Sequence, residues 1–147
     1  MVQFHLTLQL KIIMTQEDKD LLIKDICTRL PYHVKVKITY SKENGSSLRQ
    51  KICKEGDNEL NSSIYWLYEK NEINIKPYLF PLSSMEELGL LEEYENIVCC
   101  LNNDKNTDFV FLNHINQLLE FYHRNHLDYN GLIPKDLAIN ATELNIY

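Results

Sequence analysis

Four residues in the last third of the chain have side chains that could bind a metal ion. His123 and His126 are three positions apart, so they would share one face of a helix, and Asp128 follows two positions later. Two imidazoles and one carboxylate form the ligand set of many non-haem iron sites. His114 lies about one helix length earlier and would join them only if the fold brought it back.

The same residues also fit an ordinary helix end, and this is the interpretation we favour. Imidazoles beside a helix C-terminus are stabilised by the helix dipole, and an aspartate can bond the backbone of the turn that follows. We therefore predict no metal, no cofactor and no catalytic residue. A metal-dependent enzyme centred on His123, His126 and Asp128 remains an alternative.

Nucleophilic catalysis finds little support in the sequence. The four cysteines do not form a C-x-x-C pair, and two of them are adjacent at positions 99 and 100, which is a poor spacing for zinc. No G-x-S-x-G motif and no glycine-rich phosphate loop occurs. We predict reduced, mostly buried thiols. One reactive thiol is the alternative, because adjacent positions on a strand point to opposite faces.

Charge divides the chain into two parts. Residues 1–54 hold ten Lys and Arg against five Asp and Glu, whereas residues 55–147 hold five against sixteen. The first part therefore carries +5 and the second −11, which together give the net charge of −6. Such asymmetry indicates a charged partner.

A basic hairpin over residues 33–54 is the first candidate surface. Asn44-Gly45 is a strong turn signal between two alternating segments. A two-residue turn pairs Lys37 with Ile52, whereas a turn of odd length or a bulge pairs it with Lys51 or Arg49. We expect the second register, because it aligns the apolar residues. In that register four cations lie on one face, which is either an ordinary solvated surface or a nucleic-acid site. They are Lys35, Lys37, Arg49 and Lys51.

An acidic segment is the second candidate surface. Five glutamates and no base occur between residues 86 and 95: Glu86, Glu87, Glu92, Glu93 and Glu95. Glutamates on a short helix are usually solvated. A surface that mimics phosphate and occupies a basic nucleic-acid channel is the sharper hypothesis, and such a surface accelerates association.

Hydrophobic periodicity predicts the elements that must hold these residues. Alternation at 3–12 predicts a strand, or an arm that orders on a partner. Thr15 begins a helix that ends before Pro31, and a second helix starts at Ser83-Ser84 and runs to about residue 94. The clearest helix spans 108–125, with an apolar stripe that includes Phe111. Further strands are expected at 33–40, 47–53, 63–69, 73–78 and 96–101.

These elements predict an α+β fold, with a mostly antiparallel sheet of about five to six strands packed by two to three helices. A chain of 147 residues has the length of one domain, so we expect a single domain over 1–147, with 1–14 as its N-terminal strand or arm. No apolar stretch is long enough to cross a membrane and no secretory signal opens the chain. We therefore expect a cytoplasmic protein with no membrane partner.

Three segments resemble small, uncharacterised proteins of phages and prophages of the Bacteroidota. They are LLIKDICTRLPYHVKV at 21–36, IKPYLFPLSSMEE at 75–87 and FYHRNHLDYNGLIPKDLAINA at 121–141. Together they cover about a third of the chain, and their order is more specific than any one of them. The resemblance implies a phage context, and it brings no assigned activity and no catalytic residues.

Taken with this resemblance, the sequence predicts a non-enzymatic, phage- or prophage-encoded protein that binds and inhibits a host protein. An anti-defence role is the expectation, with a nuclease such as a CRISPR effector, or its RNA complex, as target. The glutamates of 86–95 and the basic hairpin are the expected contact residues. Direct nucleic-acid binding through the hairpin is an alternative, although the pI of about 5.3 argues against it. A homodimer could form through the exposed edge of the strand at 3–12.

Overall fold

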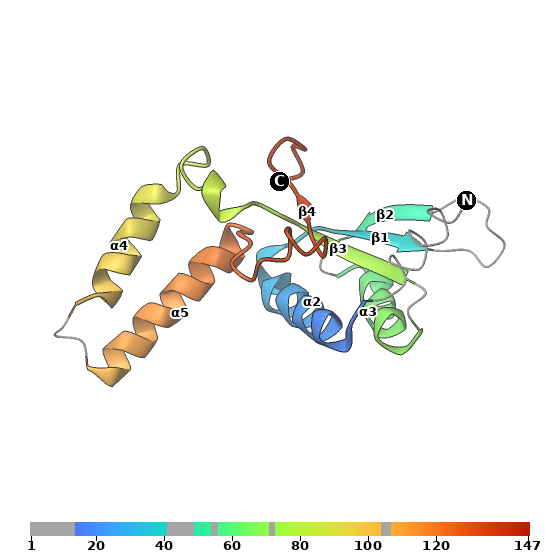
Figure 1. The fold of residues 1–147 in the computed structure, drawn as a ribbon, viewed down its shortest axis with the longest axis horizontal. Helices are drawn as coiled ribbons and strands as arrows, with labels where there is room; N and C mark the ends of the chain where they lie inside the picture. Colours follow the sequence, from blue (N-terminus) through green and yellow to red (C-terminus); the bar gives the residue numbers. More distant parts are fainter. Residues whose placement is uncertain (1–13, 41–48, 54–55, 71–72, 104–106) are drawn as a thin grey trace. The chain divides into compact units, whose positions relative to one another are not determined.

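The computed structural model describes residues 14–40, 49–53, 56–70, 73–103 and 107–147. They form an α+β fold and fall into two compact units, residues 1–77 and residues 78–147. Figure 1 shows the elements in chain order. Their bounds are α2 Gln16–Arg29, η1 Leu30–Tyr32, β1 Val36–Tyr40, β2 Arg49–Cys53, α3 Asn58–Lys70, β3 Ile73–Leu79, η2 Leu82–Ser84, α4 Leu91–Leu101, α5 Asp108–Arg124 and β4 Ile139–Asn140.

Helix α2 forms as its end signals predict. The Thr15 hydroxyl accepts a hydrogen bond from the Asp18 backbone N–H at 3.1 Å, which satisfies one of the donors left open at a helix start. The helix gives way to the short 3₁₀ turn η1 at Leu30, directly before Pro31. Leu22 and Ile26, one turn apart, are fully buried, so one face of α2 supplies part of the core of the first unit.

Strand β1 lies between β2 and β3 and pairs antiparallel with both. The predicted hairpin register is wrong, because Lys37 pairs with Ile52 and Val36 pairs with Cys53. Cys53 is buried whereas Ile52 is half exposed, so the cysteine, not the isoleucine, fills the inward position. Because isoleucine is more apolar than cysteine, the sequence favours Ile52 for the core. This preference shifts the predicted register by one residue.

The segment predicted as a strand over 63–69 belongs to helix α3 instead. Leu60, Ser63 and Leu67 are all buried, and their spacing of three and four is that of one helix face. Aromatic residues favour strands only weakly, and here burial of this face outweighs that preference. Helices α2 and α3 contact each other and lie on one side of β1 in Figure 1.

The second unit begins within β3. Tyr78 and Leu79 pair in parallel with Ile139 and Asn140 of β4, so the strand order is β2-β1-β3-β4 and the sheet is mixed. The described residues therefore hold four strands, fewer than the sequence predicts. The expected strand at 3–12 and the Asn44-Gly45 turn lie outside the described residues.

The helix predicted from Ser83 to residue 94 is also wrong. The chain makes the 3₁₀ turn η2 and then a tight turn in which Gly89 has φ of 71°, a left-handed conformation that glycine adopts at no steric cost. The Gly89 N–H bonds the Glu86 carbonyl and the Leu90 N–H bonds the Met85 carbonyl, which is the Schellman pattern that terminates helices. Helix α4 then starts afresh at Leu91.

Helices α4 and α5 pack against each other as a helical hairpin (Figure 1). Residues 96–101, predicted as a strand, lie in α4, and the predicted helix at 108–125 is confirmed as α5. A short apolar run does not distinguish a strand from a helix. In α4 the half-buried residues Tyr94, Ile97, Val98 and Leu101 recur at helical spacing.

The core of the second unit lies where the hairpin meets β3 and the following turns. Met85, Phe121 and Leu127 form its buried centre, and Phe80 pairs with Leu127 in a parallel bridge. Phe121 is fully buried, whereas Phe111 of the predicted stripe is exposed. No helix in the described part of the chain is both long and apolar enough to cross a membrane.

Candidate interaction surface

Residues of the histidine cluster form hydrogen bonds within the turn that follows α5. The Asp128 carboxylate accepts hydrogen bonds from the backbone N–H groups of Leu132 and Ile133, both at 2.8 Å. The Nε2 atom of His123 lies 2.7 Å from the hydroxyl oxygen of Tyr129. Among the described residues no group of three or more His, Cys, Asp or Glu side chains is placed to hold a metal ion. The arrangement therefore orders the chain after α5.

His126 has a separate structural role, and His114 lies elsewhere on α5. The His126 ring is buried and stacks on Tyr147 with the ring centroids 3.8 Å apart. Its backbone has φ of 55°, and its carbonyl accepts a hydrogen bond from the Phe80 N–H at 2.8 Å. The structure thus assigns His126 to the packing of the second unit.

The cysteines correct the expectation of mostly buried thiols. Only Cys53 is buried, whereas Cys27, Cys99 and Cys100 are exposed, and none of the four forms a disulfide. Cys99 and Cys100 lie on α4, so the argument that a strand would turn one of them inward does not hold. Partial burial raises the pKa of the Cys27 thiol, which leaves less of the reactive thiolate at neutral pH.

The basic hairpin does not gather its four cations at one register face. Residues directly opposite each other in an antiparallel pair share a face, and position 51 is opposite Ile38 while position 49 is opposite Tyr40. Lys37 instead shares its register position with Ile52. Positions 49 and 51 thus share a register face with Val36 and Ile38, and position 37 lies on the other, so the register predicted to place Lys37 opposite Lys51 or Arg49 is wrong.

The five glutamates of 86–95 all remain exposed. Glu86 and Glu87 lie in the turn before Gly89, and the other three lie in the first half of α4. We call this group the acidic base of the hairpin, because it lies at the end of α4 that adjoins the core: Glu86, Glu87, Glu92, Glu93 and Glu95. The side chain of Glu93 forms an exposed ion pair with Arg124 of α5.

The rest of the hairpin carries a feature that the sequence analysis missed. Among its described residues from Leu91 to Glu120, none is buried. More than half of them are apolar, namely Leu91, Tyr94, Ile97, Val98, Cys99, Cys100, Leu101, Phe109, Val110, Phe111, Leu112, Ile115, Leu118 and Leu119. An isolated pair of helices cannot cover this much apolar surface, so the hairpin has the composition of an element that packs on something else.

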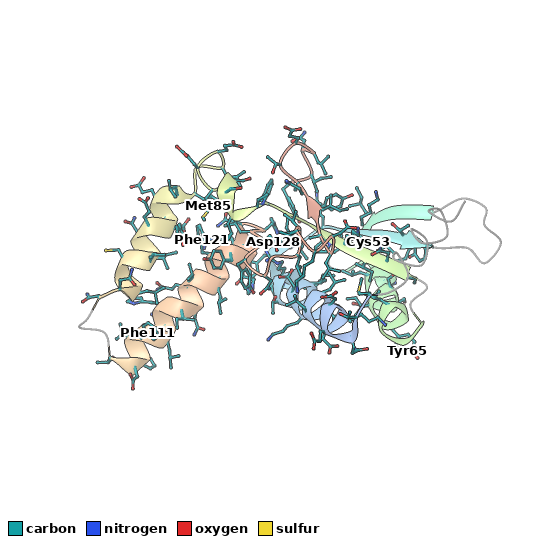
Figure 2. The ribbon with its side chains drawn as sticks, in the orientation of Figure 1. Cys53, Tyr65, Met85, Phe111, Phe121 and Asp128 are labelled. Carbon is teal, nitrogen blue, oxygen red and sulfur yellow. The ribbon has the colours of Figure 1, made fainter. Side chains whose placement is uncertain are left out.

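Exposure is greatest where α5 begins. Phe109 is 82% exposed, Leu112 59% and Phe111 43%. Figure 2 shows Phe111 near the opposite end of α5 from Phe121, which lies beside Met85 in the core. We call this end the hairpin tip and define it by Cys99, Cys100, Phe109, Val110, Phe111 and Leu112. The uninterrupted run Phe-Val-Phe-Leu was a signal for it, because a helix that buries one stripe needs apolar residues on that stripe alone.

Aromatic rings fix the core end of the hairpin. Tyr94 of α4 packs near Phe121 and Tyr122 of α5, with ring centroids 6.1 and 6.4 Å apart. Tyr122 in turn stacks on Tyr129, with centroids 5.0 Å apart and planes 15° from parallel. Burial and the neighbouring Tyr94 hydroxyl raise the pKa of Tyr122 to about 12. These rings hold α4 and α5 together, so the acidic base sits on an ordered support.

No family model, no curated protein and no solved structure matches the chain. What the second unit offers is a helical hairpin with carboxylates at its base and unburied apolar side chains at its tip. Exposed apolar patches beside polar residues are typical of interaction sites on soluble domains.

Proposed function

We propose that this protein acts by binding another protein through the α4–α5 hairpin. The observation that carries the proposal is the absence of any buried residue among the described positions between Leu91 and Glu120, although most of these residues are apolar. Exposed apolar patches of this kind mark interaction sites on soluble domains.

The charge of the second unit restricts the partner. Residues 78–147 hold eleven Asp and Glu against three Lys and Arg, a net charge of −8. On the described part of the hairpin Arg124 is the only lysine or arginine, and it is paired with Glu93. A basic surface is therefore attracted to the acidic base, and the attraction accelerates encounter more than it deepens affinity.

The partner that we propose is a host protein whose nucleic-acid channel is basic, such as a defence nuclease of the CRISPR effector type, alone or with its RNA. The resemblance of three segments to phage proteins supports a host target, and the carboxylates of the acidic base support a phosphate-mimicking contact. The inhibitor would then compete with nucleic acid for the channel. The turn around Asp128 supplies no comparable surface among the described residues.

The experiment is an affinity purification from a Bacteroidota host lysate with four forms of the full chain. The wild type and Glu143→Gln, an exposed acid outside the hairpin, are expected to retain the same host protein. Glu92→Gln/Glu95→Gln is expected to retain less, and Arg124→Gln, which removes the hairpin's described cation, is expected to retain more. Each neutralisation should change the amount of host protein retained at low salt about two- to fivefold, with the effect falling as salt rises.

Glu92→Gln/Glu95→Gln should lower retention of the host protein and Arg124→Gln should raise it. These opposite effects make the test specific to charge. A host protein that binds all four forms equally, at low and at high salt, would contradict an electrostatic contact at the acidic base. Recovery of no protein at a stoichiometric level would contradict the proposal as a whole. Circular dichroism of each form provides the folding control, and little change is expected because the side chains of Glu92, Glu95 and Arg124 are all exposed.

A further inference from the structure

The hairpin tip differs from the acidic base in charge as well as in polarity. Among the described residues that form or adjoin the tip, Asp108 alone is charged. The glutamates of the acidic base lie in the first half of α4 and in the turn before it, toward the other end of the hairpin. The tip is thus the apolar and nearly neutral end of a strongly acidic unit.

This distribution decides which occupant fits the tip. A basic partner is drawn toward the carboxylates at the other end of the hairpin and gains no charge pairing at Phe109 or Leu112. A second copy of the chain carries the same net charge, so two copies repel each other unless they meet where the charge is least. The tip is the least charged part of the hairpin, and the apolar side chains of one tip can pack against those of another. A contact in which the same patch is used by both partners is the commonest form of protein dimer.

The size of the tip sets the strength of such a contact. Phe109 and Phe111 each offer roughly 150–250 Å² when fully buried, and Phe111 is already partly covered. A stable interface takes roughly 800 Å² from each partner. The exposed parts of Phe109 and Phe111 supply less than half of that area, and Leu112 and the adjacent thiols of α4 add to it. The expected contact is therefore weak and reversible, with a Kd of about 1–100 µM.

We propose that the hairpin tip binds the hairpin tip of a second copy of this chain, so that helices of two hairpins pack against each other in a reversible dimer. Two helical hairpins that bury their apolar faces together are the ordinary route to a four-helix arrangement. The dimer leaves both acidic bases uncovered, so it offers two of them to a basic partner and gains from avidity where the geometry allows both to engage. The inference rests on the proposed function only in taking the hairpin as the binding element.

The test is sedimentation equilibrium of the full chain from about 1 µM to about 500 µM. The wild type is expected to move from the mass of one 17.4 kDa chain toward twice that mass. Phe109→Ser/Leu112→Ser is expected to stay at the mass of one chain throughout. Asn116→Ser, an exposed polar position on the same helix, is the matched control and is expected to dimerise as the wild type does. Thermal unfolding of each form shows whether the fold is kept.

Crosslinking locates the contact. In a Cys27→Ser background the exposed thiols among the described residues are Cys99 and Cys100, both at the tip. A short bismaleimide should then give a covalent dimer, and adding Phe109→Ser/Leu112→Ser should remove it. A wild type that stays monomeric at about 500 µM overturns the inference. So does a dimer that persists in the double variant, because it forms through another surface such as residues 3–12.

These results are separable from those on the proposed function. A monomeric wild type that still retains a host protein through Glu92 and Glu95 refutes tip pairing alone. A tip-dependent dimer that retains no host protein refutes the host target alone.

Discussion

Tyr147 stacks on His126, with ring centroids 3.8 Å apart and planes 11° from parallel. The Tyr147 hydroxyl also donates a hydrogen bond to the Tyr78 carbonyl at 2.8 Å, and its ring lies 5.9 Å from that of Phe80. Residue 147 is thereby attached to both the start of the second unit and the turn that follows α5. This contact fixes the support from which the hairpin extends.

Substitution of Tyr147 should separate the ring contact from the hydrogen bond. Tyr147→Phe keeps the stack and removes the bond, with an expected loss of about 0.5–1.5 kcal/mol in the free energy of unfolding. Tyr147→Ala removes both, and the aromatic pair adds about 0.5–1.5 kcal/mol to that loss. Urea denaturation followed by circular dichroism measures the difference. Equal values for the two variants would show that the stack contributes nothing.

Removing one partner of the buried ion pair of α2 should lower the free energy of unfolding more than replacing both partners. The Arg29 guanidinium donates two hydrogen bonds to the Asp25 carboxylate, at 2.8 and 3.1 Å, and both side chains are fully buried. Arg29→Met leaves the carboxylate without this cation, with an expected loss of about 3–5 kcal/mol. Asp25→Leu/Arg29→Met removes both charges, so it should lose clearly less. Equal losses for the single and the double variant in urea denaturation would contradict this reasoning.

The Asp128 carboxylate should stabilise its turn rather than serve chemistry. It accepts from two backbone N–H groups, so Asp128→Ala leaves two donors without this acceptor and should lower the free energy of unfolding by about 1–3 kcal/mol. Asp128→Asn keeps one acceptor oxygen and should lose less. Thermal unfolding measures both. If added Zn²⁺ raised the Tm of the wild type but not that of Asp128→Asn, a metal role for this aspartate would replace the structural one.

Elements with signals at their own ends could be predicted from the sequence. Thr15 and Pro31 mark the limits of α2, and Leu22 and Ile26 mark its buried face. The same holds for α5, where Thr107 accepts a hydrogen bond from the Val110 N–H as an N-cap. These signals are local, because a cap or a proline acts within a few residues.

The elements that were missed depend on contacts between distant residues. Whether Cys53 or Ile52 faces inward in β2 is decided by packing against β1 and by the turn, and the sequence of the strand alone does not specify it. Residues 63–69 read as a strand because the helical spacing of Leu60, Ser63 and Leu67 was overlooked. The helix predicted from Ser83 to about residue 94 fails at Gly89, whose left-handed turn ends one segment and allows α4 to begin.

The candidate surface was likewise visible only in part. Charge can be counted along a chain, so the glutamates from Glu86 to Glu95 were identified directly. The hairpin tip could not be found in this way, because an apolar residue becomes notable only when nothing covers it. The predicted apolar stripe includes Phe111, which is exposed, whereas the fully buried phenylalanine of α5 is Phe121.

The Tyr122 hydroxyl gives the second unit a pH dependence at alkaline pH. Burial, with the Tyr94 hydroxyl beside it, raises the pKa of Tyr122 from 10 to about 12, because the charged phenolate is poorly solvated there. The folded state therefore holds this proton more tightly than the unfolded state does. Its contribution to stability is fully present below pH 10 and is lost as the pH rises through about 12.

Tyr122→Phe keeps the ring and removes the titrating group, so the fall in stability over this window should be smaller than in the wild type. Urea denaturation at several alkaline pH values measures the slope, and tyrosinate absorbance measures the titration directly. Tyr147→Phe, which removes another hydroxyl of the same unit, is the matched control. A wild type and a Tyr122→Phe variant with the same slope would show that Tyr122 titrates alike in the folded and unfolded chain.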